Sequence, residues 1–341
     1  IIDDKGTVVK KLEEAGAVLV AKLTLGALAW GDVWFGGKTR NPWDIEQGAS
    51  GSSAGPGSAT SAGLVGFSIG SETWGSIVSP STRNGVTGLR PSFGTVSRSG
   101  AMALSWTMDK LGPMTRSVEG AAIIFETIRG SDNIDRTVRD VPFIYPSKRG
   151  LKNLRIGYIA SAFVDSSVSE NDKASLDVLK SMGLNLIPIE LPKFPTQALS
   201  FVLQAEAAAA FDELTRSNKD DQLVRQVKSA WPNVFREARF IPAVEYINAN
   251  RARTLLNQKM SELMEKIDVY IIPSFYEDNL LRTNLTGHPC VVVPNGFNKK
   301  GRPTSISFVG GLYSDGNPLA VAKAYQEATK WHKQYPPEFN N

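Results

Sequence analysis

The sequence contains few of the residues on which disulfides and metal sites depend. Cys290 is the only cysteine among 341 residues, so a disulfide within the chain is excluded. Its position in an apolar run, between Pro289 and Val291, predicts a buried and unreactive thiol. Histidine occurs only at positions 288 and 332. Because clustered histidines or cysteines are missing, we expect no metal site of the nitrogen or sulfur type.

Long apolar runs and blocks of like charge are also missing. No run of about 18 apolar residues occurs, so the sequence predicts no membrane-spanning helix. The net charge is only +4, and lysine and arginine are scattered, so a nucleic-acid-binding arm is not expected. Hydrophobic residues at 42% and charged residues at 21% are typical of a globular enzyme of one large domain or two. The composition leaves the compartment open, with the cytoplasm as the default.

The first residues of the chain look like an internal part of a domain rather than its beginning. The chain starts at Ile1 without a methionine or a signal-peptide pattern. Apolar residues at helical spacing predict a helix over 7–15, and the run at 17–21 predicts a buried strand. A helix–strand unit of this kind opens an α/β layer. We therefore expect that an N-terminal portion is missing.

Alternating helix and strand patterns continue along the chain and predict an α/β fold. Strands are expected at 64–69, 154–159, 184–189, 269–273, 290–293 and 305–309. Helices are expected to start at 79–83 and to span 117–128, 169–181, about 196–215, about 242–267 and 319–331. The aromatic residues of the loop-rich segment 23–47 are expected to pack rather than to hold a substrate; they are Trp30, Trp34, Phe35 and Trp43.

The stretch from Gly48 to Gly100 differs from the rest of the chain. Glycine and serine dominate its first part, as in a flexible linker, but the apolar strand at 64–69 follows at once. A second small-residue loop, Gly70–Ser76, comes after that strand. Two serine-bearing loops at the ends of one strand indicate a site, because glycine lets the backbone approach a ligand closely.

The order of motifs in this stretch resembles the amidase signature family. The chain has Gly51-Ser52-Ser53-Ala54-Gly55, then Gly70-Ser71-Glu72-Thr73-Trp74-Gly75-Ser76, then Gly88-Leu89-Arg90-Pro91. Ser52 and Ser76 lie 24 residues apart, as in the family. The resemblance continues at Asn41-Pro42-Trp43-Asp44, Asp109-Lys110-Leu111-Gly112-Pro113 and Gly287-His288-Pro289.

The resemblance implies a fold and a domain plan. It implies an α/β/α sandwich with a mixed central β-sheet covered by helices on both faces. Residues 1–341 would form a single amidase signature domain that lacks its N-terminal portion. The signature core would cover about 41–115, and a variable region that shapes the substrate site would cover about 135–280.

The resemblance also implies a serine amidohydrolase that needs neither metal nor organic cofactor. Ser76 would be the acylated nucleophile, and Ser52, after a cis peptide bond, would relay its proton to a lysine base. The N–H groups of Thr73, Trp74, Gly75 and Ser76 would bind the oxyanion, with Ser53 and Ser71 in support. The partner would be a small-molecule amide. A homodimer is left open.

The chain departs from the family pattern at several positions. Trp74 stands where the family usually has glycine, and its indole favours apolar or aromatic substrates. Val78 stands where the family often has an arginine that some members use for an anionic substrate. The family's lysine base lies upstream of the helix at 7–15, so no lysine of this chain is assigned as the base. Lys22 matches a second family lysine that is commonly structural, and Lys5, Lys10 and Lys11 are expected in solvent. Either the base stands on a missing N-terminal segment, or this chain is not competent alone.

Three other interpretations stay open. Gly51-Ser52-Ser53-Ala54-Gly55 fits the Gly-x-Ser-x-Gly nucleophile elbow with Ser53 as nucleophile, although a polar, turn-like segment precedes it instead of a strand. The catalytic component of a tRNA-dependent amidotransferase (its A subunit), which releases ammonia from glutamine, shares the same signature. The third is a scaffold that has kept the fold without its base. A Ser-His-Asp triad is poorly supported, because His288 lies in a turn-like segment and His332 in a polar tail.

Overall fold

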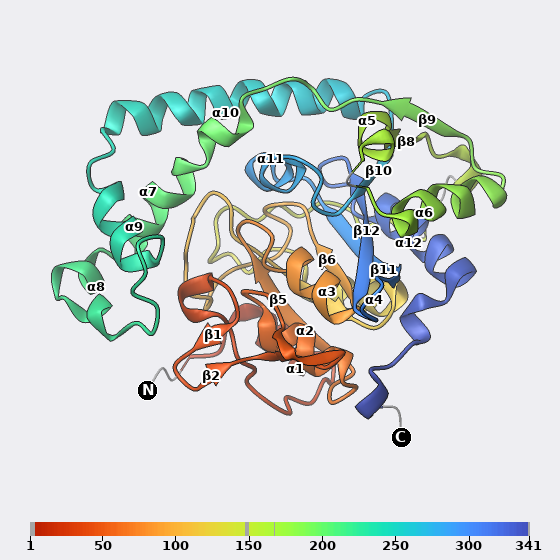
Figure 1. Ribbon diagram of the computed structural model, residues 1–341. Coiled ribbons are helices and arrows are strands. Elements are labelled where there is room, and N and C mark those ends of the chain that lie inside the picture. The colour runs from red at the N-terminus through yellow and green to blue at the C-terminus, as the bar shows by residue number, and fades with distance from the viewer. Residues whose placement is uncertain (1–3, 147–149, 167, 340–341) are drawn as a thin grey trace.

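The protein is built around one eight-stranded mixed sheet (Figure 1). The structure, a computed structural model, describes residues 4–146, 150–166 and 168–339. The strand order is β5-β7-β6-β11-β12-β10-β8-β9. The pairs β10–β8 and β8–β9 are parallel, and the other neighbours are antiparallel. The strands of this sheet are β5 (Phe67–Glu72), β6 (Thr87–Arg90), β7 (Lys110–Thr115), β8 (Ile156–Ile159), β9 (Leu186–Ile189), β10 (Val269–Pro273), β11 (Cys290–Phe297) and β12 (Pro303–Gly310).

Two short hairpins stand outside this sheet. They are formed by β1 (Val33–Trp34) with β2 (Gly37–Lys38) and by β3 (Arg40–Asn41) with β4 (Asp44–Gly48). The 3₁₀ turns are η1 (Ala27–Ala29), η2 (Leu151–Asn153), η3 (Thr196–Leu199), η4 (Lys219–Gln222), η5 (Trp331–Lys333) and η6 (Pro337–Phe339).

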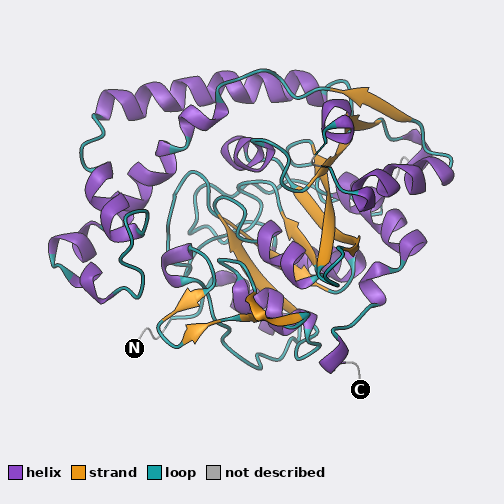
Figure 2. Cartoon of the chain, viewed as in Figure 1, coloured by secondary structure: helices purple, strands orange, loops and turns teal. Residues whose placement is uncertain are grey.

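Helices cover both faces of the sheet, as expected for an α/β/α sandwich (Figure 2). On one face α2 and α3 pack on β5, β6 and β11, and on the other α4 and α12 pack on β6, β7, β11 and β12. Gly88 and Thr87 of β6 point to these two opposite layers, as neighbouring residues of a strand do. The helices in these layers and at the sheet's ends are α1 (Thr7–Glu14), α2 (Ala54–Ser61), α3 (Val78–Asn84), α4 (Val118–Ile128), α5 (Ala160–Val164), α6 (Glu170–Ser181), α11 (Asn279–Thr286) and α12 (Gly316–Thr329).

Four further helices form an extension beside the sheet, which we call the helical arm (residues 201–264). They are α7 (Phe201–Ala210), α8 (Asp212–Arg216), α9 (Trp231–Ala238) and α10 (Ala243–Met264). In Figure 1, α8 and α9 lie on the side of the molecule away from β9, and α10 runs along the top of the molecule toward β8 and β9. No helix of the described chain is both long enough and apolar enough to span a bilayer.

Several predicted elements are confirmed with shifted ends. The helix expected at 117–128 is α4, capped by the Ser117 hydroxyl, and the helix expected at 169–181 is α6 with a Ser169–Asp172 capping box. The strand expected at 64–69 is three residues later, so residues 70–72 belong to β5 rather than to a loop.

Other predictions were wrong. The single helix expected over 196–215 is broken into η3, α7 and α8, and α9 was not predicted. Helix α2 was also missed, since the Gly/Ser-rich segment forms a buried helix rather than only a loop. The strand expected at 17–21 is not a strand: within the described residues, no backbone group of residues 18–23 bonds to another backbone group. Val18, Leu19 and Val20 are 82%, 59% and 69% exposed instead of buried.

Candidate active site

The first serine loop connects β4 to α2 and holds Ser52 in the interior. The Gly51–Ser52 peptide bond is cis. The Ser52 carbonyl accepts a hydrogen bond from the Gly26 N–H (2.9 Å), which joins this loop to the N-terminal segment. The Ser52 hydroxyl is buried and has no partner among the described residues. Ser52 therefore has a side-chain hydroxyl that is free to bond to a further group.

Ser53 connects the first serine loop to the second serine loop, which now comprises residues 73–76 between β5 and α3. Its N–H donates to the Ser76 carbonyl (3.1 Å), and its hydroxyl donates to the Ser71 carbonyl (3.1 Å) and accepts from the Ser71 N–H (3.0 Å). These three bonds fix the Ser52 segment against the edge strand β5 and against Ser76. Because the Ser53 hydroxyl is fully buried and engaged, it is badly placed to act as the nucleophile of an elbow.

Glu72 is the last residue of β5, and its carboxylate binds the backbone at the start of α3, directly after Ser76. One carboxylate oxygen accepts from the N–H groups of Ile77 (2.8 Å) and Val78 (2.9 Å). The other accepts from Arg90 and from the Asn284 amide. Burial alone would raise the pKa of Glu72, but the Arg90 charge and these hydrogen bonds hold it below its ordinary value. The carboxylate thus stays charged and holds the turn that carries Ser76.

The four residues from Thr73 to Ser76 keep their N–H groups unengaged. Across the described chain, no N–H group of residues 73–76 donates to another protein atom. Gly75 has φ +92°, and a Cβ there would lie 2.7 Å from Leu280 Cδ2, so only glycine fits this turn. Free N–H groups beside a serine hydroxyl are the arrangement that stabilises the oxyanion of a tetrahedral intermediate.

Ser76 lines a cavity of about 260 Å³ between the second serine loop and the helical arm. Trp30 and Trp231 meet edge to face in its wall, with ring centroids 5.0 Å apart. The Trp231 indole N–H donates to the Leu28 carbonyl (2.8 Å), so α9 is fixed to the N-terminal segment. Of the residues that the structure describes, no charged side chain lines this cavity; its lining residues are Ala29, Trp30, Thr73, Trp74, Ser76, Leu104, Ser200, Leu203, Gln204, Trp231 and Val234.

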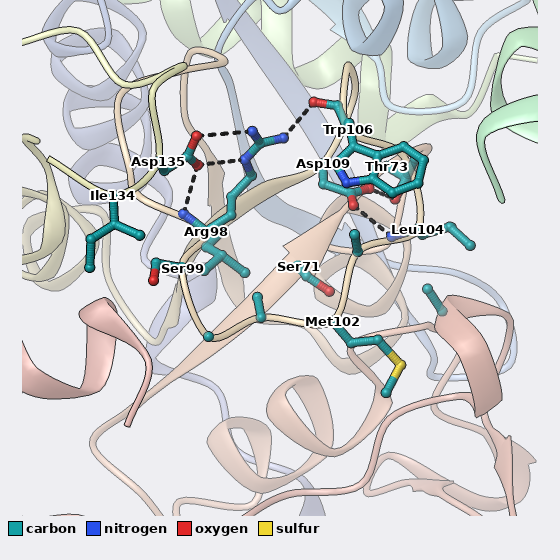
Figure 3. A pocket seen from close by; sticks show the side chains of 15 residues that line it. Ser71, Thr73, Arg98, Ser99, Met102, Leu104, Trp106, Asp109, Ile134 and Asp135 are labelled. Atoms are coloured by element: carbon teal, nitrogen blue, oxygen red, sulfur yellow. Dashed lines mark hydrogen bonds and ion pairs between the residues drawn. The ribbon is translucent and has the colours of Figure 1, made fainter. Parts of the chain in front are cut away.

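A second cavity of about 330 Å³ lies beside the first and shares Ala29, Thr73 and Leu104 with it (Figure 3). Arg98 crosses its wall, where it pairs with Asp135 (2.8 Å) and donates to the Trp106 carbonyl (2.6 Å). Thr73 therefore stands between the two cavities, and its hydroxyl donates to Asp109 (2.6 Å).

The environment of the two histidines does not favour either as a base for Ser76. His288 is buried, its Nδ1 bonds to the Thr286 hydroxyl (2.8 Å), and burial with the Arg90 charge lowers its pKa to about 4. Neither His288 nor His332 lines the Ser76 cavity. In the part of the chain that the structure describes, no group of three His, Cys, Asp or Glu residues could hold a metal ion.

Comparisons with known proteins show the family of the chain. The sequence profile of the Amidase family matches residues 2–282. The chain belongs to the amidase signature family. It is therefore an amidase-family hydrolase, with a mixed central sheet that superposes on those of solved amidase signature enzymes.

The relatives of this amidase-family chain differ in what they are named for. It is 30% identical to the A subunit of the Glutamyl-tRNA(Gln) amidotransferase of Rippkaea orientalis, over 98% of this chain and 79% of the relative. Among solved structures, the peptide amidase of Stenotrophomonas maltophilia is 25% identical with a TM-score of 0.83, over 99% of this chain and 79% of that one. A bacterial aryl acylamidase, 20% identical with a TM-score of 0.82 over 97% and 76%, shares the fold.

The lysines of this amidase-family chain are distributed differently from expectation. Lys22 is exposed, and Lys5 and Lys10 pair with Glu13 and Asp4 at the surface. Lys11 is not in solvent as expected, since its amine donates to the Arg129 and Gly130 carbonyls. Lys110, which stands in one of the family motifs but was not weighed as a base, is buried and donates to the Met108 carbonyl.

Several residues of the site were missed because they come from distant segments. Trp231, Leu203 and Gln204 belong to the helical arm, and no local pattern joins them to the serine loops. Trp30 was expected only to pack, yet it lines the Ser76 cavity. Glu72 and Arg90 stood in the family motifs, and their opposite charges in otherwise uncharged strands were the signal of a buried pair.

Proposed function

We propose that this protein hydrolyses a carboxamide that has an uncharged apolar or aromatic acyl group, through an acyl-enzyme on Ser76. The observation that carries the proposal is the position of Ser76, which lies between four unengaged N–H groups and a tryptophan-lined cavity without charged side chains. Trp74 and Trp231 supply flat apolar surface, and Gln204 and Ser200 supply neutral polar groups.

In the proposed reaction the Ser76 hydroxyl oxygen attacks the amide carbon, and the carbonyl electrons move to oxygen. The N–H groups of Thr73, Trp74, Gly75 and Ser76 bind that oxyanion. Ser52 receives the Ser76 proton and passes it to a base, which by family resemblance is a lysine. When the intermediate collapses, the C–N bond breaks and the amine leaves with a proton; water then releases the carboxylate.

The labelling of Ser76 by a fluorophosphonate tests this proposal. The protein is treated with the reagent, its intact mass is measured, and the labelled residue is mapped in wild type and in Ser76→Ala. We expect one adduct, on Ser76, that is lost in the variant. An adduct on Ser53 would favour the nucleophile elbow instead. No adduct at all would favour a scaffold that lacks its base.

Glutaminase activity within a tRNA-dependent amidotransferase is the second candidate, because one relative of this chain is named the A subunit of a Glutamyl-tRNA(Gln) amidotransferase. Free glutamine has an ammonium and a carboxylate group, and buried charges need charged or strongly polar partners. The Ser76 cavity has no charged lining side chain, which favours a neutral substrate. Hydrolysis of glutamine but not of aryl amides, or co-purification with a partner protein, would reverse this preference.

We assign the choice of substrate to the variable region at about 135–280, within the single domain of residues 1–341. The signature core at about 41–115 supplies the serine loops. The helical arm lies within the variable region and supplies Leu203, Gln204 and Trp231 to the cavity wall.

A further inference from the structure

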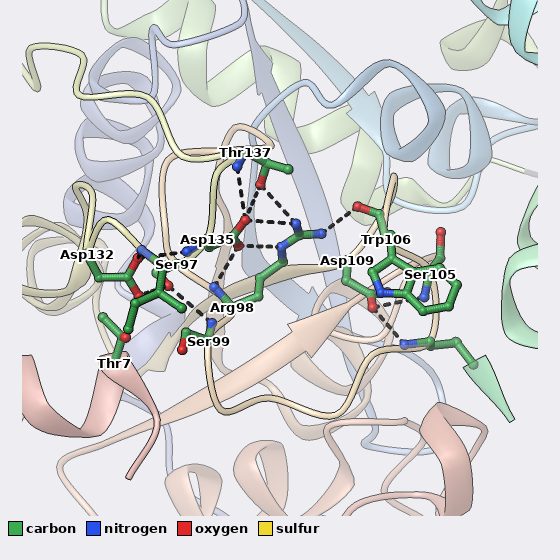
Figure 4. A network of polar contacts seen from close by, with 12 residues as sticks. Thr7, Ser97, Arg98, Ser99, Ser105, Trp106, Asp109, Asp132, Asp135 and Thr137 are labelled. Atoms are coloured by element: carbon green, nitrogen blue, oxygen red, sulfur yellow. Dashed lines mark hydrogen bonds and ion pairs between the residues drawn. The ribbon is translucent and has the colours of Figure 1, made fainter. Parts of the chain in front are cut away.

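The loop from Leu104 to Asp109, which we call the 104–109 loop, connects the second serine loop to the helical arm. One oxygen of the Asp109 carboxylate accepts from the Thr73 hydroxyl (2.6 Å). The other accepts from the N–H groups of Leu104 (2.8 Å) and Ser105 (2.9 Å). Figure 4 shows Asp109 beside Ser105 in this loop. Asp109 therefore fixes Thr73, the first residue of the proposed oxyanion hole, to the backbone of this loop.

On its other side, the 104–109 loop is held by Glu206 of α7. One oxygen of this carboxylate accepts from the Ser105 hydroxyl and from the Thr107 N–H (3.1 Å). The other accepts from the Thr107 hydroxyl (2.7 Å) and from the Tyr246 hydroxyl of α10 (2.7 Å). Glu206 is only 4% exposed, so these four bonds replace the water that a carboxylate would otherwise bind.

Arg253 of α10 adds a second connection between the arm and the same loop. Its guanidinium donates to the Thr107 hydroxyl (2.7 Å) and to the Thr107 carbonyl (2.8 Å). Thr107 is thus fixed by two helices of the arm. Leu104, three residues earlier, lines both cavities beside Ser76. The 104–109 loop is therefore held to the arm at one end and to Thr73 at the other.

We infer that Glu206 is a positioning residue for the oxyanion hole, acting through the 104–109 loop and Asp109 on Thr73. The inference rests on the proposed function. Glu206 touches neither cavity, but Leu203 and Gln204 on the same helix line the one at Ser76. Helix α7, which would contact the acyl group, would thereby also hold the oxyanion-binding N–H groups at a fixed distance from the substrate oxygen. Oxyanion stabilisation depends steeply on that distance, because the donors must be preorganised for the transition state.

A matched pair of variants separates positioning from simple structural support. Ser105→Ala removes a hydroxyl bond between Glu206 and the loop, and Tyr246→Phe removes a hydroxyl bond between the same carboxylate and α10. We expect Ser105→Ala to slow fluorophosphonate labelling of Ser76 roughly tenfold, less than the loss of a direct oxyanion donor. Tyr246→Phe is expected to leave the labelling rate within about twofold of wild type, although both lower the urea midpoint.

Two changes at Glu206 itself complete the test. Glu206→Gln keeps the shape, and its amide can donate to the Thr107 and Tyr246 hydroxyls, so the labelling rate should stay within about threefold of wild type. Glu206→Met should slow it roughly a hundredfold. Binding of an uncharged aryl amide, followed by tryptophan fluorescence, should stay unchanged in both, because the cavity wall is intact.

The outcomes distinguish this inference from the proposed function. If Ser76 is labelled in wild type but Ser105→Ala and Tyr246→Phe label at equal rates, Glu206 has only a structural role and the inference is overturned. If no variant and no wild-type sample is labelled on Ser76, the proposed function fails and the inference fails with it.

Discussion

Glu72 and Arg90 form an ion pair whose side chains are both completely buried, with Arg90 Nη1 2.9 Å from Glu72 Oε1. The second Glu72 oxygen caps the N–H groups that follow Ser76, and the second Arg90 nitrogen donates to the His288 carbonyl (2.9 Å). The pair therefore links three segments, namely the second serine loop, β6 and the start of β11. Its charges are compensated only while both partners are present.

Replacing Arg90 by methionine should destabilise the protein strongly. The change leaves the Glu72 carboxylate buried without its cation, a situation that costs about 3–5 kcal/mol. Urea unfolding of wild type and Arg90→Met measures the loss. The double variant Glu72→Gln/Arg90→Met serves as the control and should recover part of the stability, because neither charge remains. Equal stability of the single and double variants would contradict this account.

Exchanging Trp74 for glycine should change which amides are preferred. The indole lines the Ser76 cavity and is only partly exposed, so its removal opens the wall beside the nucleophile. We expect kcat/KM for aryl amides to fall roughly tenfold or more relative to small aliphatic amides, since burial of an aromatic side chain's surface is lost. A ratio that stays at the wild-type value would remove Trp74 as a determinant of preference. The Ser76 labelling rate reports whether the nucleophile stays intact.

Asp315 should give the stability a distinctive dependence on pH. Burial raises the pKa of its carboxyl from 3.8 to about 6, against the lowering effect of hydrogen bonds from Ser92. Because the pKa of Asp315 is higher in the folded protein than in the unfolded chain, its contribution to stability is fully present below the unfolded-state pKa. This contribution to stability is lost as the pH rises through the folded-state pKa. From pH 3.8 to about 6 the loss is on the order of 3 kcal/mol.

Asp315→Asn should flatten that slope, because asparagine resembles the protonated carboxyl and cannot ionise. Urea midpoints across this pH range measure the difference between wild type and variant. His288, with its pKa lowered to about 4, contributes a slope of the opposite sign in both proteins and cancels in the comparison. Parallel profiles of the two proteins would show that Asp315 has an ordinary pKa.

Lys110 should lower stability near neutral pH. Burial and the neighbouring Arg90 charge hold the pKa of its amine well below the ordinary value of 10.5. At a pH between the lowered folded-state pKa and 10.5, the unfolded chain binds the Lys110 proton more tightly than the folded protein does. The stability of the folded protein therefore rises with pH up to about 10.5. Lys110→Met, of similar length, should be at least as stable as wild type at pH 7, with the gap narrowing as pH rises. Thermal unfolding at pH 7 and pH 10 tests this, and a variant that loses stability would assign Lys110 a supporting role.

The regular elements were predictable where the local pattern decides the structure. Helix α4 has its apolar face and its Ser117 cap in the sequence, and β10, β11 and β12 are apolar runs with clear ends. Helix α2 was not predictable from propensity, because glycine and serine are poor helix formers. It forms because nearly all its residues are buried against β5 and α3, and such burial overrides propensity.

The serine loops of the candidate site could be predicted from motif order, and the structure brings Ser52, Ser53, Ser71 and Ser76 into one region. The cavity beside Ser76 could not be predicted. Its wall joins Trp30 to Trp231, some two hundred positions apart in the chain, and no local pattern encodes such a contact. The hydrogen bonds from Glu206 to the 104–109 loop could not be predicted from the sequence for the same reason.

The segment at residues 18–23 has a consequence for how the protein behaves at high concentration. Within the described residues its backbone groups bond to no other backbone group, and its side chains at 18–20 are apolar and exposed. An extended apolar segment with free N–H and C=O groups is a template for cross-strand association between molecules, and natural proteins block such templates with charge. Concentrated solutions should therefore aggregate through this segment. Leu19→Lys should raise the concentration at which light scattering begins, without altering the cavity at Ser76.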